Sequence, residues 1–397
     1  MSKFTLRWGI LATGGIAESF SRDLTVNPET RKVKDIQHEI VAAASSSSAD
    51  RAGQFLKKVG APSSAKAYGS YEELVADKNV DIIYVATPHS HHYQNAMLCL
   101  EAGKNVLCEK AFTVNAAQAK KLVEKAKEKN LFLMEAVWTR YFPLSVYVRE
   151  VITSGKIGKV HRTFADLSIG TQPEDAFDNS HRMVNPELAG GALLDLGIYA
   201  LTWVFQTLYH TQPESARKAP TVASSLKKYP TGADEMTTML LTFPRSEELG
   251  GDAHGIATTA FRVTPDPDGK GSAGPAIRVQ GDKGEVQVFH PAFRPTKTKL
   301  ILNDGTVEEK EFTHPGPGKG SGFYNGFGDD KNSEGEGHGM FWEADECAFA
   351  IKEGRKEGQY EGLQESVVIM ETMDEVRKQN GMTYPEKIET TKYPTQL

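Results

Sequence analysis

A glycine-containing turn that could bind phosphate is formed by Ala12, Thr13, Gly14, Gly15 and Ile16. An apolar strand precedes this turn and a helical pattern follows it. A strand, a glycine turn and a helix in this order direct backbone N–H groups and the positive end of the helix dipole at one point, where a pyrophosphate can bind. The expected motif is G-x-G-x-x-G/A, and in this chain alanine replaces its first glycine. Ala12 suits it if its φ is negative, and Gly14 lets the backbone approach phosphate. The alternative is an ordinary strand–helix turn.

The second expected strand, residues 39–44, ends at hydroxyl side chains and not at a carboxylate. They belong to Ser45, Ser46 and Ser47, with Arg51 just beyond. An NAD site places Asp or Glu here for the ribose hydroxyls, whereas the 2′-phosphate of NADP needs donors such as a guanidinium. The pattern favours NADP, although Ser48 could simply N-cap a helix over 49–59 and Arg51 could be solvated.

Lys110 follows Glu109 at the end of another expected strand, residues 105–108. Ligands bind outside the carboxyl ends of the strands in open α/β sheets, so this position places Lys110 at the ligand crevice. A surface ion pair between the two residues is the alternative.

A strongly apolar helix is expected from Ala192 to Tyr209, and it carries Asp195 and Tyr199. Residues four apart lie on one face of a helix, one turn above the other. An aspartate among leucines is costly to bury without a partner, so Asp195 needs a cation or nearby backbone N–H groups.

Three histidines, His89, His91 and His92, follow Thr87 and Pro88 at the end of a strand over 81–86. No cysteine or carboxylate stands at ligand spacing from them. The sequence therefore predicts no metal site, and we expect these histidines to have structural or cofactor-contact roles.

The elements that position these residues fall into two domains, 1–142 and 143–397. The first alternates strands and helices, which predicts an α/β Rossmann domain with a doubly wound parallel sheet. The second has strands at 159–169, 236–243, 255–263, 277–280 and 285–289, the last four without helices between them. This pattern predicts an α+β domain with a mostly antiparallel sheet. Residues 313–337, dense in glycine, are expected to form a long loop or a mobile lid.

Composition excludes several classes of protein. With 39% hydrophobic and 25% charged residues in 397, the chain reads as soluble and globular, and its net charge of −6 argues against nucleic acid. We expect no membrane span, since no segment approaches the ~20 apolar residues required, and no signal peptide. Three cysteines without a C-x-x-C motif indicate reduced thiols and a cytoplasmic protein.

Together these motifs resemble the Gfo/Idh/MocA oxidoreductase family over nearly the whole chain. The resemblance rests on the glycine turn, Thr87-Pro88 with His92, Glu109-Lys110 and residues 190–199. Ala111 stands where many members have proline, and Tyr199 where many have histidine. Tyr199, residues 131–143, 180–183 and 338–343 resemble the branch of dimeric dihydrodiol dehydrogenases and fungal NADP-dependent D-xylose 1-dehydrogenases.

The resemblance implies hydride transfer to NADP from the anomeric hydroxyl of D-xylose, or of other aldopyranoses such as D-glucose, giving an aldonolactone. Tyr199 would be the base, activated by the ammonium of Lys110, and Asp195 would hold Lys110 or a sugar hydroxyl. Arg182, with Asp195 and Tyr199, would contact the sugar. The expected cofactor contacts beyond the glycine turn and serines are Thr87, Pro88, His89, His92, Glu109, Lys110, Trp138 and Arg140; plain packing is the alternative for Trp138.

The alternatives are a trans-1,2-dihydrodiol dehydrogenase, an aldose–aldose oxidoreductase, and a non-catalytic NADP-binding regulator. The resemblance also implies a homodimer that forms through a helix-free face of the second sheet, since exposed apolar faces usually mark interfaces.

Overall fold

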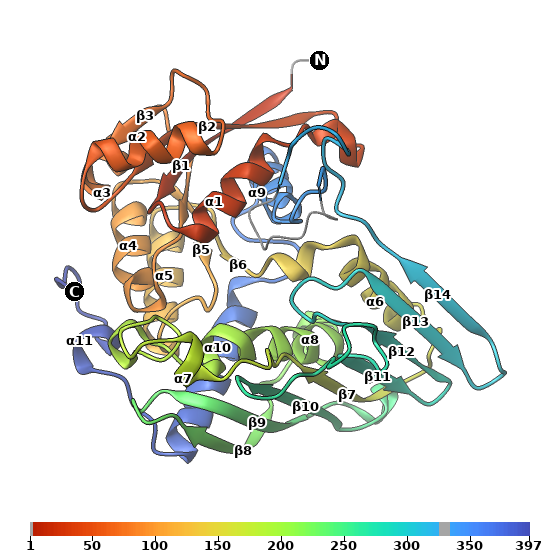
Figure 1. Cartoon of the computed structure of the whole chain (residues 1–397). Coiled ribbons are helices and arrows are strands. Elements are labelled where there is room, and N and C mark those ends of the chain that lie inside the picture. Colours follow the sequence, from red (N-terminus) through yellow and green to blue (C-terminus); the bar gives the residue numbers. More distant parts are fainter. Residues whose placement is uncertain (1–2, 325–333) are drawn as a thin grey trace.

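The computed structural model describes residues 3–324 and 334–397 and contains two β-sheets with helices between them (Figure 1). The first sheet has six parallel strands in the order β3-β2-β1-β4-β5-β6. They are β1 (Phe4–Leu11), β2 (Ile36–Ala44), β3 (Lys66–Tyr68), β4 (Ile82–Val85), β5 (Asn105–Glu109) and β6 (Leu133–Ala136). The predicted doubly wound parallel sheet is confirmed.

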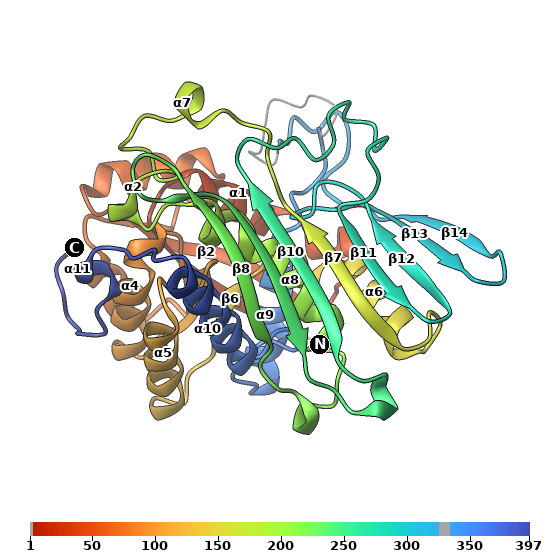
Figure 2. The ribbon, with the colours of Figure 1, turned by 90° about the horizontal axis from the view of Figure 1, so that it is seen from below.

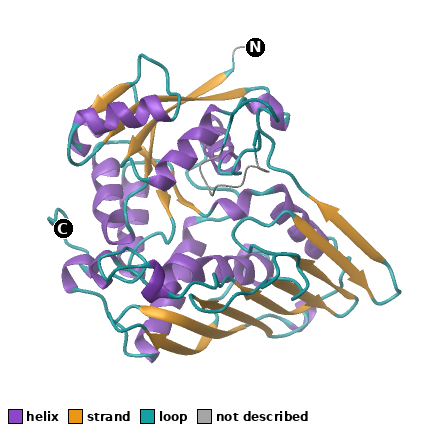
Figure 3. Cartoon of the chain, viewed as in Figure 1, coloured by secondary structure: helices purple, strands orange, loops and turns teal. Residues whose placement is uncertain are grey.

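Helices cover both faces of this sheet (Figure 3). They are α1 (Gly15–Thr25), α2 (Ala49–Lys58), α3 (Tyr71–Ala76), α4 (His89–Glu101) and α5 (Ala116–Glu128). The helix α9 (Phe341–Glu353) returns from the distant C-terminal part and packs on α1, β1 and β2. The predicted boundary at residue 142 stays a prediction: all six strands of this sheet lie before it, whereas α9, which packs on the sheet, lies after it.

The second sheet has eight strands in the order β14-β13-β12-β11-β7-β10-β9-β8. They are β7 (Val160–Asp166), β8 (Thr221–Lys228), β9 (Asp234–Phe243), β10 (Ala253–Ala260), β11 (Ile277–Gly281), β12 (Gly284–Val288), β13 (Lys297–Leu302) and β14 (Val307–Glu311). All neighbours are antiparallel except β7 and β10. The mostly antiparallel sheet was predicted; β8, β13 and β14 were not. The described parts of 313–337 contain no helix or strand, and residues 325–333 lie outside the description.

One face of the second sheet carries helices, and the other is open (Figure 2). The helix α8 (Ile198–Leu208) packs on β7 and β10, while α6 (Pro143–Thr153) and α10 (Leu363–Gln379) lie beside it. The burial of side chains alternates along β9. Met239 and Leu241 are fully buried, whereas Met236 and Leu240 on the opposite face are 42% and 45% exposed. The sheet therefore presents apolar side chains away from its helices.

The expectation that no segment has the length and composition of a membrane span is wrong for residues 186–208. This 23-residue stretch contains an 18-residue window with a mean hydropathy of 1.6, but 94% of that window is buried inside the protein. It is the central helical segment of the second sheet's core, where packing demands the same apolar composition.

Candidate active site

A cavity of about 760 Å³ lies at the carboxyl ends of β1, β4 and β5, facing the helical turn that leads into α8 and the first residues of α8. Because parallel strands end at one edge, their last residues and the loops that follow converge there. Most sequence-predicted residues line the cavity: Gly14, Gly15, Ile16, Thr87, Pro88, His89, His92, Glu109, Lys110, Trp138, Arg182, Asp195 and Tyr199.

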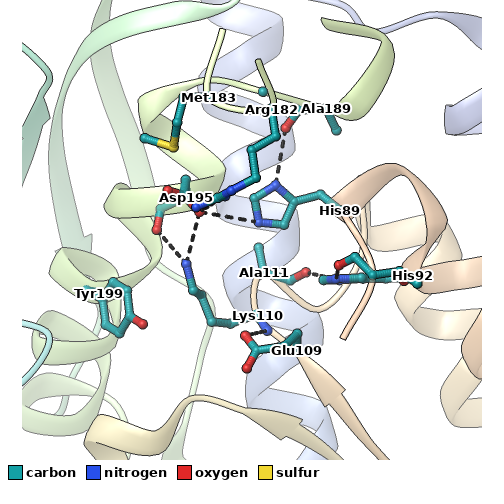
Figure 4. A network of polar contacts seen from close by, with 12 residues as sticks. His89, His92, Glu109, Lys110, Ala111, Arg182, Met183, Ala189, Asp195 and Tyr199 are labelled. Carbon is teal, nitrogen blue, oxygen red and sulfur yellow. Dashed lines mark hydrogen bonds and ion pairs between the residues drawn. The ribbon is translucent and has the colours of Figure 1, made fainter. Parts of the chain in front are cut away.

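Lys110 and Asp195 form the central contact of the cavity (Figure 4). Lys110 Nζ donates to the backbone oxygen of Asp195 at 2.7 Å and lies 3.2 Å from its Oδ1. Arg182 Nη1 donates to the same Oδ1 at 2.9 Å. Although burial opposes ionisation, Lys110 and Arg182 hold the pKa of Asp195 well below its usual range. The partner that the buried aspartate requires is thus a pair of cations.

Tyr199 lies beside this pair, with Lys110 Nζ 4.9 Å from the centre of its ring. Its hydroxyl accepts a hydrogen bond from Trp138 Nε1 at 2.8 Å. Burial, followed by the nearby carboxyl of Glu109, raises the pKa of Tyr199 well above its ordinary value. The prediction that the Lys110 ammonium favours the phenolate stays a prediction, since burial has the largest effect on the pKa of Tyr199 in the protein alone.

The helical face carrying Asp195 and Tyr199 differs from the predicted regular helix. Residues Leu193–Gly197 form a π-helical turn, and α8 begins only at Ile198. Single π turns of this kind are frequent at functional sites. Both side chains still face the cavity.

The glycine turn lies where a phosphate could reach the first turn of α1. Gly14 is the N-cap, no side chain caps the helix, and a Cβ on Gly14 or Gly15 would enter open space. Ala12 contradicts the expected negative φ, since its φ is +84°. Its N–H donates to Ala44 of β2 at 3.2 Å, so the strand pairing holds this backbone in a conformation that favours glycine.

Ser45, Ser46, Ser47 and Arg51 lie outside the cavity, at the carboxyl end of β2 beside the glycine turn. Ser45 is buried and its hydroxyl is 3.0 Å from that of Ser47, whereas Ser46, Ser47 and Arg51 are exposed. Ser48 accepts from the N–H of Arg51 at 3.2 Å, which confirms that it N-caps α2.

The histidines have structural contacts. His92 lies between the backbone oxygens of Ala111 and Thr87, at 2.9 and 2.8 Å, and so connects the loops that follow β4 and β5. His89 faces Ala189 and Asp195. Within residues 3–324 and 334–397, no group of three His, Cys, Asp or Glu side chains is placed to hold a metal ion.

The Glu109 carboxylate lies at the cavity wall, and both of its oxygens accept hydrogen bonds. Tyr84 in β4 donates to Oε1, and the N–H of Lys110 donates to Oε2 at 3.1 Å. Burial raises the pKa of Glu109, against the opposing effects of Lys110 and Tyr84.

Arg140 is not a cavity residue, and its predicted contact with cofactor is wrong. Its side chain is fully buried, contacts Glu365 and lies 3.6 Å from Glu361. Trp138, two residues earlier, does line the cavity. Consecutive residues of the short 3₁₀ helix Trp138–Tyr141 point in different directions, so Trp138 faces the cavity while Arg140 enters an interior ion pair.

Several cavity residues had no sequence signal. They are apolar side chains of the segment after β7, which runs over 167–189, and of the connection between β12 and β13: Leu167, Ile169, Phe177, Leu188 and Phe293. Loop residues show no periodicity, so only the folded chain brings them to the site.

Comparison with known proteins identifies the class. The model of the GFO/IDH/MocA oxidoreductase family with an NAD-binding Rossmann fold matches residues 6–137, and that of the family's C-terminal domain matches residues 145–287. The chain belongs to the Gfo/Idh/MocA oxidoreductase family.

Individual proteins show which members of this family the chain is similar to. The chain is 57% identical over 394 residues to D-xylose 1-dehydrogenase (NADP(+)) of Hypocrea jecorina, covering 98% of this chain and 96% of the relative. It is 35% identical over 381 residues to trans-1,2-dihydrobenzene-1,2-diol dehydrogenase of Homo sapiens, covering 96% and 98%. The solved aldose-aldose oxidoreductase of Caulobacter crescentus has the same fold, with a TM-score of 0.70 at 19% identity over 94% of this chain and 97% of that one.

Proposed function

We propose that this protein is an NADP-dependent dehydrogenase that oxidises the anomeric hydroxyl of D-xylose, and of other aldopyranoses such as D-glucose, to the aldonolactone. The observation that carries the proposal is the meeting of Lys110 with Asp195 and Tyr199 beside the N-terminus of α1. The 57% identity to an NADP-dependent D-xylose 1-dehydrogenase supports the substrate.

The residues present fit NADP. The uncapped N-terminus of α1 and the open space at Gly14 and Gly15 suit a pyrophosphate. The exposed Ser46, Ser47 and Arg51 suit a 2′-phosphate, which an arginine fork binds well. When bound, NADP supplies the hydride acceptor.

The proton of the oxidised hydroxyl passes to Tyr199 in this proposal. Tyr199 is a neutral phenol at rest because burial raises its pKa. It therefore takes up the substrate proton only as the phenolate, after its own proton has left to solvent, and a positive charge nearby favours that loss. Lys110 supplies such charge at 4.9 Å from the ring. Asp195 holds the ammonium in place through two contacts.

The balance of charge in the cavity supports a neutral substrate. Lys110 and Arg182 are matched by Glu109 and Asp195 along the cavity wall. A sugar phosphate or sugar acid would bring unmatched charge into a partly buried site, which is costly. An uncharged polyol would form hydrogen bonds without that cost.

The test is NADPH formation with D-xylose by purified protein, with Lys110→Met as the variant. We expect turnover by the unaltered protein and its loss in the variant, while NADP binding measured by fluorescence titration persists. Full activity of Lys110→Met would contradict the role of Lys110. A side-by-side assay with NAD tests the cofactor preference.

Three further activities are outcomes of a substrate panel. Faster oxidation of trans-dihydrodiols than of aldoses would indicate the activity named for the human relative. Turnover that requires a second sugar as acceptor, without NADPH release, would indicate an aldose–aldose oxidoreductase. Tight NADP binding without turnover would indicate a regulator.

We also propose a cytoplasmic homodimer without membrane or nucleic-acid partners. The exposed Met236 and Leu240 on the open face of the second sheet support the interface. The buried, unpaired Cys99, Cys108 and Cys347 support a reducing compartment. Sedimentation of the protein and of Leu240→Asp tests the dimer, and cell fractionation tests the location.

A further inference from the structure

His89 occupies a position in the cavity that its predicted role as a cofactor contact does not explain. It begins α4 directly after Pro88 and is 7% exposed. Its ring points across the cavity toward the second half of the site and not along the sheet edge (Figure 4). Nδ1 lies 3.3 Å from the backbone oxygen of Ala189, and Nε2 lies 3.9 Å from Asp195 Oδ1.

The contact with Ala189 determines which ring nitrogen carries the proton. A carbonyl oxygen only accepts, so Nδ1 must be the N–H donor there. Burial lowers the pKa of His89 to about 3, so the ring is neutral near pH 7. Nε2 is therefore an unprotonated acceptor that faces the cavity.

Two acceptors consequently face each other across a gap. Asp195 is an ionised carboxylate held by Lys110 and Arg182. The 3.9 Å between its Oδ1 and His89 Nε2 exceeds hydrogen-bond range. Asp195 Oδ1 already accepts from Lys110 and Arg182, whereas His89 Nε2 faces that carboxylate as a second acceptor, so a hydroxyl placed beside Nε2 can donate to it. Arg182, which donates to the same Asp195 oxygen, can also donate to the oxygen of that hydroxyl.

The gap lies beside the reacting position. In Figure 4, Tyr199 and His89 lie on opposite sides of the Lys110–Asp195 pair. A substrate that has one hydroxyl at Tyr199 can therefore present another hydroxyl of the same molecule toward His89, across this pair.

We propose that His89 is a specificity-determining residue, whose Nε2 accepts a hydrogen bond from the substrate hydroxyl adjacent to the one oxidised. The substrate class is then a vicinal diol, of which the anomeric and adjacent hydroxyls of an aldopyranose are one case. This assignment rests on the proposed function and states which feature of the substrate the site recognises.

The test compares D-glucose with 2-deoxy-D-glucose, which lacks only the adjacent hydroxyl. A site built to hydrogen-bond a hydroxyl discriminates strongly against the analogue without it, so we expect the unaltered protein to favour D-glucose in kcat/KM by about 10- to 100-fold. His89→Phe keeps an aromatic ring without an acceptor, and it should reduce this preference to within about threefold by slowing D-glucose alone. His89→Gln keeps an acceptor and should retain part of the preference.

The control is His91→Phe, a neighbouring histidine outside the cavity, which should leave the preference unchanged. A second pair of substrates, trans-cyclohexane-1,2-diol and cyclohexanol, should show the same dependence on His89. NADP affinity should stay within about threefold in all variants.

The outcomes separate the two proposals. Equal losses with both sugars in His89→Phe and His89→Gln, or weakened NADP binding with an unchanged preference, would overturn the assignment of His89 while the dehydrogenase proposal stands. No oxidation of any aldose or diol by the unaltered protein would overturn the proposed function, and the assignment with it.

Discussion

The hydrogen bond from Trp138 to Tyr199 offers a direct test of whether the phenol handles the proton. Trp138 Nε1 donates to the Tyr199 oxygen at 2.8 Å in a buried setting. Such a bond contributes about 0.5–1.5 kcal/mol to a neutral acceptor and about 1.5–3 kcal/mol to a charged one. If oxidation requires Tyr199 as the phenolate, Trp138→Phe should raise the barrier from the neutral resting enzyme by the difference, about 1–2 kcal/mol.

This difference corresponds to a loss of about 5- to 30-fold in kcat/KM. It should also move the alkaline rise of the pH–rate profile upward by about one unit, because the indole is among the groups that lower the pKa of Tyr199. The assay is initial NADPH formation from D-xylose as a function of pH. Phenylalanine retains the ring contacts with Phe142, Phe293 and His338.

Two controls isolate the hydrogen bond. Trp342→Phe removes an indole whose N–H has no hydrogen-bond partner among the described residues, and it should leave the profile unchanged. In a Tyr199→Phe background, Trp138→Phe should have no further effect. A change below twofold with an unmoved profile, or an equal effect with and without the Tyr199 hydroxyl, would refute the reasoning.

Three predictions concern stability. Ala12→Gly should raise the free energy of unfolding in urea by about 1 kcal/mol, because relief of the positive φ exceeds the entropy cost of glycine; a decrease would show that the turn is unstrained. Burial lowers the pKa of His314 to about 3, below its unfolded value, so the neutral ring stabilises the fold above pH 6.5 and loses this contribution as pH falls. Unfolding at pH 6.5 and 4.5 should show about 2–3 kcal/mol less acid destabilisation in His314→Phe than in the unaltered protein; an equal acid sensitivity would contradict this. Arg140→Leu should cost about 3–5 kcal/mol, since it leaves Glu365 buried with its cation removed; a near-neutral effect would mean the acid is satisfied elsewhere.

Local sequence patterns were sufficient for five of the six strands of the first sheet and for the edge of the site, but they missed the short edge strand β3. The glycine turn, the serines after β2 and Lys110 after β5 each follow a buried strand, and parallel strands must end together. Arg140 shows the limit of such reasoning, because its partner Glu365 stands 225 positions later in the chain. A run of residues reveals that an arginine is present but not that a distant helix brings a carboxylate to it.

The backbone of Ala12 and the pKa of Tyr199 illustrate the same limit at shorter range. The φ of Ala12 depends on the pairing of β1 with β2, which its N–H joins. The phenol's pKa depends on how completely the surrounding chain excludes water. Neighbouring charges can be listed from a sequence, whereas desolvation is a property of the packed site and here has the larger effect.

The contact between Lys110 and Asp195 explains why the site needs both halves of the molecule. Lys110 leaves the first sheet, while Asp195 and Tyr199 belong to the helical segment that packs on the second. Each buried charge alone would be costly, and each is stabilised only when the halves meet. Arg182 adds a second cation from the loop above the cavity. The polar groups that would orient a diol are therefore the same groups that join the two halves of the molecule. Substitutions at Asp195 should consequently alter both substrate selection and the packing of the site.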